Sequence, residues 1–182
     1  MAVIFFLYLL FPSELFRDAL EEGVAQIDPD LMIVTETIQP TIPPGLKLQP
    51  LKISYTDFPV LHSDYLKVTP NLFSLLSDPI VFNFKGLMGS GDFRGRGEIN
   101  RKTKRPQDKL MLNLNNIPVE VLEILELWPQ YRPSGELSGR LNYDSLKGAG
   151  GTVEADVRIT PFRITLNPPL MGLETLDFSE LK

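Results

Sequence analysis

Alternation of apolar and polar residues runs through most of the chain after residue 30 and predicts a β-rich domain. The clearest run is KLMLNLNN at 109–116, in which every second residue is leucine. Successive side chains of a strand point to opposite faces, so this pattern predicts one buried face and one wet face. Comparable runs predict further strands at 31–38, 46–55, 80–86, 91–100, 135–144 and 151–160. Pro50 breaks the alternation inside 46–55, which favours an edge strand or a bulge there.

Two segments have helical rather than alternating spacing. NLFSLLS at 71–77 follows a proline, and PVEVLEILELW at 118–128 begins with one, at a position where the first turn of a helix tolerates proline. In the second segment an apolar stripe faces a row of glutamates, which is typical of a helix packed on a sheet. We therefore expect two short helices at the rim of the sheet.

A short similarity links two of the predicted strands. GDFRGR at 91–96 and GELSGR at 135–140 recur 44 positions apart, each after a strand and a proline-initiated helix. Glycines at alternate positions permit close backbone approach or strong curvature. The expected fold is a mainly β, α+β domain: a curved, mostly antiparallel sheet with short rim helices. Its concave face would present an apolar groove lined by Phe82, Phe84, Phe93, Leu110, Leu112, Leu114, Leu137 and Leu141.

The N-terminal twelve residues, MAVIFFLYLLFP, contain no charge and are almost entirely apolar. A membrane-spanning helix needs roughly 20 such residues, and a signal peptide would show a basic start and a small-residue cleavage site. A membrane anchor shortened at its N-terminus is the favoured interpretation of 1–12; a core element and an uncleaved signal remain open. The anchor would consist mainly of Ile4, Phe5, Phe6, Leu7, Tyr8, Leu9, Leu10 and Phe11.

An amphipathic pattern follows the apolar segment. Ser13 is suited to cap a helix, and apolar residues then recur at helical spacing to Ile27. This divides the chain into an anchor at 1–12, a connecting helix at 13–27 and a curved sheet domain at 28–182.

Composition narrows the function. The net charge of −5 argues against nucleic acid as the partner, because phosphate neutralisation needs surplus Lys and Arg. The segment RKTKRPQDK at 101–109 is basic, and we interpret it as a solvated hairpin tip, with contact to lipid or an acidic partner as the alternative. The chain has no cysteine, which excludes disulfides and thiolate chemistry.

Catalytic chemistry is sparse. The single histidine, His62, lies in PVLHSDY, which we interpret as a polar surface hairpin. One histidine without cysteine excludes a His/Cys metal site, and the glycine-rich stretch at 86–97 leads into a strand rather than the helix of a phosphate loop. We expect no enzyme activity, no cofactor and no metal.

The order of several motifs resembles the type II secretion system protein N family. These are PPGLKL at 43–48, K-x-T-P-x-x-x-S-L-L at 67–76 and GLETLDFSEL at 172–181, within a similarity that runs across essentially the whole chain. The resemblance implies a single-pass inner-membrane protein with its main domain in the periplasm, assisting the assembly that exports folded proteins. It also implies kinship with the AsmA-like group and its lipid-handling curved sheets. Members of the family usually have a longer anchor with basic residues before it and continue past this C-terminal element, so we expect a partial chain.

Three functions therefore compete. The favoured one is a non-enzymatic secretion-system component whose partners are the membrane and other secretion proteins. The alternative is an AsmA-like module that binds or transfers lipid, which an uncovered apolar sheet face would favour. The third, a soluble enzyme built on His62, has least support.

Overall fold

In the computed structural model, the described part of the chain forms a single antiparallel sheet of ten strands. The structure describes residues 13–14, 17–18, 20–22, 29–56, 58–100, 108–123, 125, 129–145, 151–179 and 181. The strands are β1 (Leu31–Thr41), β2 (Gly45–Tyr55), β3 (Phe58–Ser63), β4 (Tyr65–Pro70), β5 (Ile80–Met88), β6 (Gly91–Ile99), β7 (Lys109–Pro118), β8 (Tyr131–Asp144), β9 (Thr152–Leu170) and β10 (Leu173–Phe178). Two 3₁₀-helices interrupt them, η1 (Ser74–Leu76) and η2 (Val119–Val121).

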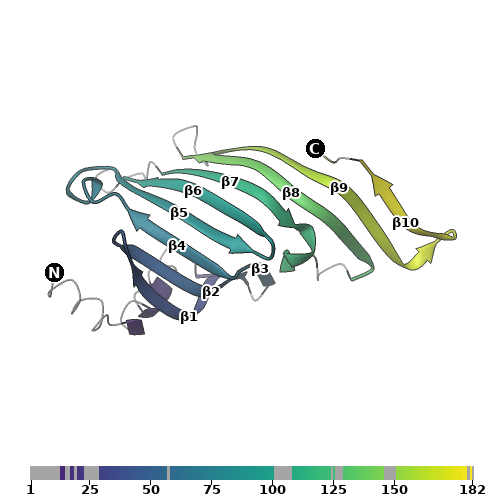
Figure 1. Cartoon of the computed structure of the whole chain (residues 1–182), viewed down its shortest axis with the longest axis horizontal. Coiled ribbons are helices and arrows are strands. Elements are labelled where there is room, and N and C mark those ends of the chain that lie inside the picture. The colour runs from purple at the N-terminus through teal and green to yellow at the C-terminus, as the bar shows by residue number, and fades with distance from the viewer. Residues whose placement is uncertain are drawn as a thin grey trace.

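The strands follow one another across the sheet in the order β1-β2-β4-β5-β6-β7-β8-β9-β10, with β3 beside β2. Each of these pairings is antiparallel, so the chain meanders from one edge to the other. Figure 1 shows the result as an elongated, twisted sheet, with the β1–β2 hairpin at one end and β10 at the other. The predicted mostly antiparallel sheet is confirmed.

Strands β3 and β4 together form one broken partner of β2. Leu48 pairs with Leu66 and Leu51 pairs with Ser63, which continues the same register across the break at Asp64. Pro50 lies opposite that break, where its missing N–H costs no ladder hydrogen bond. The side chain of Ser63 is fully buried there, and its hydroxyl lies 2.8 Å from the carbonyl oxygen of Tyr65 and 2.7 Å from that of Leu87. Pro50 therefore marks neither an edge strand nor a bulge, but the point where β2 changes partner.

Strand register gathers the alternating apolar residues on one face. Directly paired residues of antiparallel strands point to the same side of the sheet. One row of partners runs from Phe84 through Gly95 and Leu112 to Leu141, crossing four strands. The intervening residues, such as Asn83, Lys85 and Arg94, fall on the other face. We refer to these two sides as the apolar face and the polar face.

Two clusters form the core. The first consists of Ile38, Leu48 and Leu51, with Leu20 packed against it from outside the sheet. The second consists of Met88, Phe93 and Ile117, and is extended by half-buried apolar residues of β3 to β8 and by Val121 and Leu122. Both Leu48 and Leu51 are buried although Pro50 lies between them, so β2 contributes to one cluster on both sides of its phase change.

Phenylalanine rings lie over glycines of the neighbouring strand. Phe82 pairs with Gly97 and Phe84 pairs with Gly95. A Cβ atom added at Gly97 would lie 2.1 Å from Cζ of Phe82, and one added at Gly95 would lie 2.3 Å from Cζ of Phe84. The rings therefore cover backbone that lacks side chains, as aromatic residues do when they stabilise a strand glycine. The apolar face therefore continues from β5 onto β6 although β6 has glycine at both positions.

The two predicted rim helices are wrong in extent. Within 71–77 the structure has only η1, and among the described residues of 118–128 it has η2 and 3₁₀ conformation at Glu123 and Leu125. Segments this short cannot offset the cost of helix nucleation unless an apolar stripe packs on the fold. Phe73, directly before η1, and Leu76 within it instead have exposed fractions of 88% and 94%, so these two side chains do not pack on the sheet.

The repeat prediction also fails in detail. β6 and β8 do carry the two glycine-rich motifs and flank β7 on either side. However, β5 lies between η1 and β6, whereas β8 follows the η2 segment directly. The two units therefore differ by one strand.

The C-terminal part contains more sheet than the sequence predicts. The strand predicted at 151–160 continues to Leu170, and β10 pairs with its far end. Between the pairs Glu136–Thr160 and Ser134–Arg163, Gly135 of β8 faces two residues of β9, Pro161 and Phe162. Proline is tolerated in a strand at such a bulge, which is why Pro161 does not end β9.

The N-terminal predictions fall largely outside the described residues. None of the anchor residues from Ile4 to Phe11 is described, nor is most of the basic segment at 101–109. The described residues between Ser13 and Glu22 are helical, and a guanidinium nitrogen of Arg17 donates a 2.6 Å hydrogen bond to the carbonyl oxygen of Glu36 in β1. Among helices in the described part of the chain, none has the length and apolarity to cross a membrane.

Replacing Gly97 by alanine tests the ring-over-glycine arrangement. We expect Gly97→Ala to lower the free energy of unfolding by about 1–3 kcal/mol, since the new methyl group displaces the Phe82 ring. Denaturant unfolding of Gly97→Ala, Phe82→Ala and the double variant would measure it as a mutant cycle. The cost of Gly97→Ala should shrink in the Phe82→Ala background; an equal cost in both backgrounds would contradict the arrangement. Asn83→Ala, exposed on the polar face of β5, is the control and should change stability by less than about 0.5 kcal/mol.

Candidate functional site

The apolar face of β5 to β8 brings together all eight residues that the sequence predicts for a groove. Pairing in register places Phe82, Phe84 and Phe93 beside the three leucines of β7, and these beside the leucines of β8. Only Phe93 is buried, with an exposed fraction of 7%; the other seven are half-buried. The face therefore continues over four strands and stays partly open to solvent.

Cover over this face is confined to one end in the described part of the chain. Val121 and Leu122, at the end of β7, pack on the cluster of Met88, Phe93 and Ile117. Toward the opposite end of the strands the apolar face continues through Leu110, and Leu76 of η1 is exposed. The prediction that two rim helices bound the face is thus replaced by a single cap. We call residues 118–125 the cap segment.

His62 lies in the antiparallel hairpin of β2 and β3, within its second strand rather than in its turn. It lies in β3, paired with Lys52 of β2, and its Nδ1 atom is 3.0 Å from Oε1 of Glu123 in the cap segment. Both side chains are partly exposed, at 39% for His62 and 27% for Glu123. The contact joins two elements 61 residues apart in sequence. It links the cap segment to β3.

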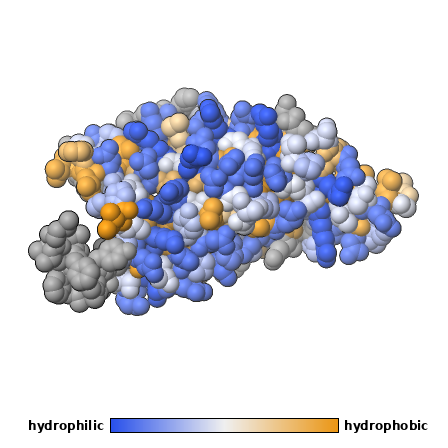
Figure 2. Space-filling view, in the orientation of Figure 1, coloured by the Kyte–Doolittle hydropathy of each residue, from blue (hydrophilic) through white to orange (hydrophobic). Residues whose placement is uncertain are grey.

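Cations line up across the polar face. Lys47 of β2 lies directly opposite Lys67 of β4, Lys67 opposite Lys85 of β5, and Lys85 opposite Arg94 of β6. Like charges in direct cross-strand pairs are destabilising. We call these four residues the cation row. In the part of the sheet viewed in Figure 2, the surface is largely hydrophilic, while hydrophobic residues gather at the two ends.

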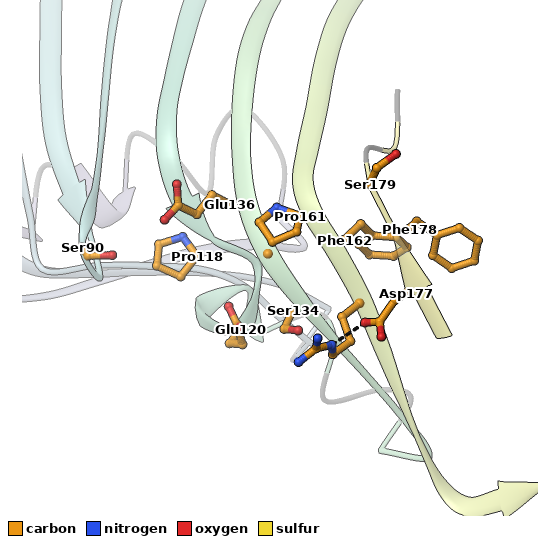
Figure 3. Close-up of a pocket in the computed structure, with 12 residues that line it drawn as sticks. Ser90, Pro118, Glu120, Ser134, Glu136, Pro161, Phe162, Asp177, Phe178 and Ser179 are labelled. Atoms are coloured by element: carbon orange, nitrogen blue, oxygen red, sulfur yellow. Dashed lines mark hydrogen bonds and ion pairs between the residues drawn. The ribbon is translucent and has the colours of Figure 1, made fainter. Parts of the chain in front are cut away.

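An open pocket of about 760 Å³ lies where β8 and β9 approach β10 (Figure 3). Phe162 and Phe178 pack side by side, with ring centroids 5.8 Å apart. Nε of Arg163 donates a hydrogen bond to Oδ1 of Asp177, marked by the dashed line at Asp177 in Figure 3. Glu120 and Glu136 lie on the opposite side of the pocket and are exposed.

One ion pair, between Arg163 and Asp177, lies on the wall of this pocket. The hydrogen bond to Asp177, with the charge attraction that accompanies it, raises the pKa of Arg163 above its ordinary value. Arg163 thus stays protonated, and it ties β9 to the edge strand β10. A permanently charged guanidinium supplies neither a base nor a nucleophile, so the pair serves to hold strands together.

No group of three or more His, Cys, Asp or Glu residues that could hold a metal ion occurs in the described residues. Sequence patterns pointed to the apolar face, but they missed Glu123 as the partner of His62, Asp177 as the partner of Arg163 and the cation row. These depend on register between strands, which alternation within one strand does not reveal. For the cation row, the sequence offers only the lysines and arginine at positions 47, 67, 85 and 94. Their alignment can be recognised once the strand pairing is known.

Comparison of the chain with protein-family models, with curated proteins and with solved structures finds no match.

Replacing Glu123 by alanine tests the role of its contact with His62. The cap segment should open more often, because the link to β3 is lost. We expect amide hydrogen exchange at Leu122 and Leu125, which donate backbone hydrogen bonds within the segment, to accelerate about fivefold, which corresponds to about 1 kcal/mol. Global stability should fall by less than about 1 kcal/mol, as expected for a partly exposed pair. Glu120→Ala is the neighbouring control; equal acceleration in both variants would refute the link.

Proposed function

We propose that this chain is a non-enzymatic binding protein of the bacterial cell envelope, and that its apolar sheet face holds the hydrocarbon part of a lipid. The observation that carries this proposal is the continuous apolar face of β5 to β8, half-buried and capped at one end. The fold by itself leaves this face partly in contact with water. Each methylene group of a ligand buried there would contribute about 0.8 kcal/mol to the free energy of binding.

The shape of the face supports a flexible apolar ligand. Over β5 and β6 the rings of Phe82 and Phe84 lie above glycines of the neighbouring strand and extend the apolar surface across it. The leucines of β7 and β8 continue it without a charged residue among the eight. A continuous hydrocarbon surface offers contact area but no polar groups that would fix the orientation of a rigid small molecule. An acyl chain suits such a surface.

The cap segment would close this binding face at one end. Val121 and Leu122 cover the cluster around Ile117, and the contact between His62 and Glu123 holds the segment in place. A chain lying on the face would meet this cap at one end of the strands. It would enter from the other end, on the side of Leu110.

A second proposed role is that of a type II secretion component, and it rests on the motif order described above. On that resemblance the chain would be a single-pass inner-membrane protein anchored by residues 1–12, with the sheet in the periplasm and the other secretion proteins as its partners. One structural feature favours a docking role: β1 and β10 are edge strands, and each leaves one side of its backbone without a strand partner among the described residues. Such edges can take up an additional strand from a partner.

Photo-crosslinking tests the lipid proposal. A benzophenone amino acid at Leu112, on the apolar face, should capture lipid in bacterial cells, and mass spectrometry would identify the adduct. Met111 is the matched control, since it is adjacent in β7 but points to the polar face and has an exposed fraction of 53%. Because both proteins keep the same N-terminus, any lipid bound there affects them equally. Adducts at neither position, or the same adducts at both, would refute binding on this face.

Fractionation and deletion test the secretion role. We expect the full-length protein in the inner-membrane fraction, and a reduced amount of exported folded protein in the medium after deletion of its gene. Recovery of the protein in the cytosol, or unchanged export in the deletion strain, would eliminate this role. Either result would leave the crosslinking experiment unaffected.

A further inference from the structure

One end of the sheet carries four strongly exposed apolar side chains. Ile42 lies in the turn between β1 and β2, and Leu72, Phe73 and Leu76 lie in the loop between β4 and β5. Their exposed fractions are 79%, 52%, 88% and 94%. Because Leu46 at the start of β2 pairs with Val68 near the end of β4, the turn and the loop lie at the same end. We call these four residues the apolar tip; Figure 2 shows hydrophobic surface at this end of the molecule.

The loop of the apolar tip is held by hydrogen bonds around Ser74. The Ser74 side chain is buried; its hydroxyl lies 2.7 Å from the carbonyl oxygen of Asn71 and accepts a 2.9 Å hydrogen bond from the amide of Val81. The amide of Asn71 donates in turn to the carbonyl oxygen of Val81. Asp78, the one acid of this loop, is half-buried and has its own partner in the fold. Phe73 and Leu76 therefore point outward from an ordered loop, not from a loose one.

The cation row begins directly behind the apolar tip. Lys47 is two residues from the start of β2 and Lys67 is three residues from the end of β4, so both lie about 7–10 Å behind the ends of their strands. Nζ of Lys67 donates a hydrogen bond of 3.4 Å to the carbonyl oxygen of Ile42 in the tip itself. Among the described residues no carboxylate pairs with Lys47, Lys67 or Lys85.

The exposed apolar tip and the opposed lysines are each unfavourable in water, and one kind of partner would stabilise both. Exposed large apolar residues gain when they enter hydrocarbon, and opposed lysines gain when anions lie between them. An acidic peptide would satisfy the lysines and leave Phe73 and Leu76 in water. Apolar groups of peripheral proteins enter a bilayer by about 5–10 Å, which would bring Lys47 and Lys67 to the depth of the headgroup phosphates.

We propose that this end of the sheet docks on an anionic phospholipid bilayer, with the apolar tip inserted and Lys47 and Lys67 against the phosphates. This contact is separate in sequence from the N-terminal apolar segment. It also does not depend on what the apolar face binds. It would fix the orientation of the sheet, with its strands pointing at the membrane surface.

Site-specific fluorescence tests the docking. The chain has no cysteine, so Phe73→Cys in the full chain can be labelled uniquely with an environment-sensitive dye. The label should shift to the blue on vesicles of phosphatidylcholine containing phosphatidylglycerol. Met171→Cys is the matched control, because Met171 is 97% exposed in the turn at the opposite end of the sheet. Both proteins retain the N-terminal segment, so its membrane affinity does not distinguish them.

Charge reversal tests the lysines. In the labelled protein, Lys47→Glu with Lys67→Glu should reduce the ratio of inserted to free label at residue 73 by at least about 30-fold, the factor for removing two cations from an anionic surface, since the two added carboxylates lower it further. Arg132→Glu, an exposed cation at the other end of the sheet, should leave the ratio unchanged. No shift at residue 73, equal shifts at 73 and 171, or insensitivity to the double reversal would overturn the proposal. A dye shift without vesicles that grows with protein concentration would also overturn it, and would assign the tip to a second copy of this chain. Binding of polyglutamate, with no shift of the label at residue 73 on vesicles, would overturn it too and would assign the lysines to an acidic protein.

Discussion

Antiparallel pairing of successive strands in continuous register is the constraint on which the rest of this structure depends. From β4 to β7 the register runs without a shift between neighbours. Every residue is therefore matched with a partner on the same face, strand after strand. Phenylalanine meets glycine, leucine meets leucine, and lysine meets lysine because of this one alignment. A slip of one residue in any strand would exchange the two faces of that strand.

The ring-over-glycine pairs explain how so open a sheet retains an ordered apolar face. A sheet of this width has helical cover over small areas only in the described part of the chain, so much of its apolar surface cannot be buried between layers. Rings laid over a neighbouring strand remove apolar area from water within a single layer. They also shield backbone that glycine would otherwise expose. The same geometry keeps the face continuous, which is the property that the proposed lipid binding uses.

The two faces differ in chemistry because side chains in a sheet diverge from it rather than converge. Polar residues on an open sheet face lie side by side in rows that follow the strand register. The contacts between polar groups in this molecule accordingly join elements: His62 to Glu123 across the edge of β3, and Arg163 to Asp177 between β9 and β10. The cation row differs from these pairs, because its members lie opposite one another and no carboxylate among the described residues pairs with its three lysines. A planar anionic surface matches a planar row of cations.

Local sequence determined which segments become strands, which residues share a face and where the apolar residues lie, because period-two alternation is a property of the chain within each strand. Local sequence did not determine that residues 58–63, with His62 among them, form strand β3. The pairing of this segment with β2 depends on a break at Asp64 opposite Pro50. Helical spacing at 71–77 and 118–128 was overridden because neither segment has a sheet face long enough to support a helix. Tertiary structure alone decided that Phe82 lies on Gly97, that Glu123 reaches His62 and that Lys67 lies between two other lysines. Each of these is a relation between strands, and the energy that selects it arises only when register has brought the two partners together.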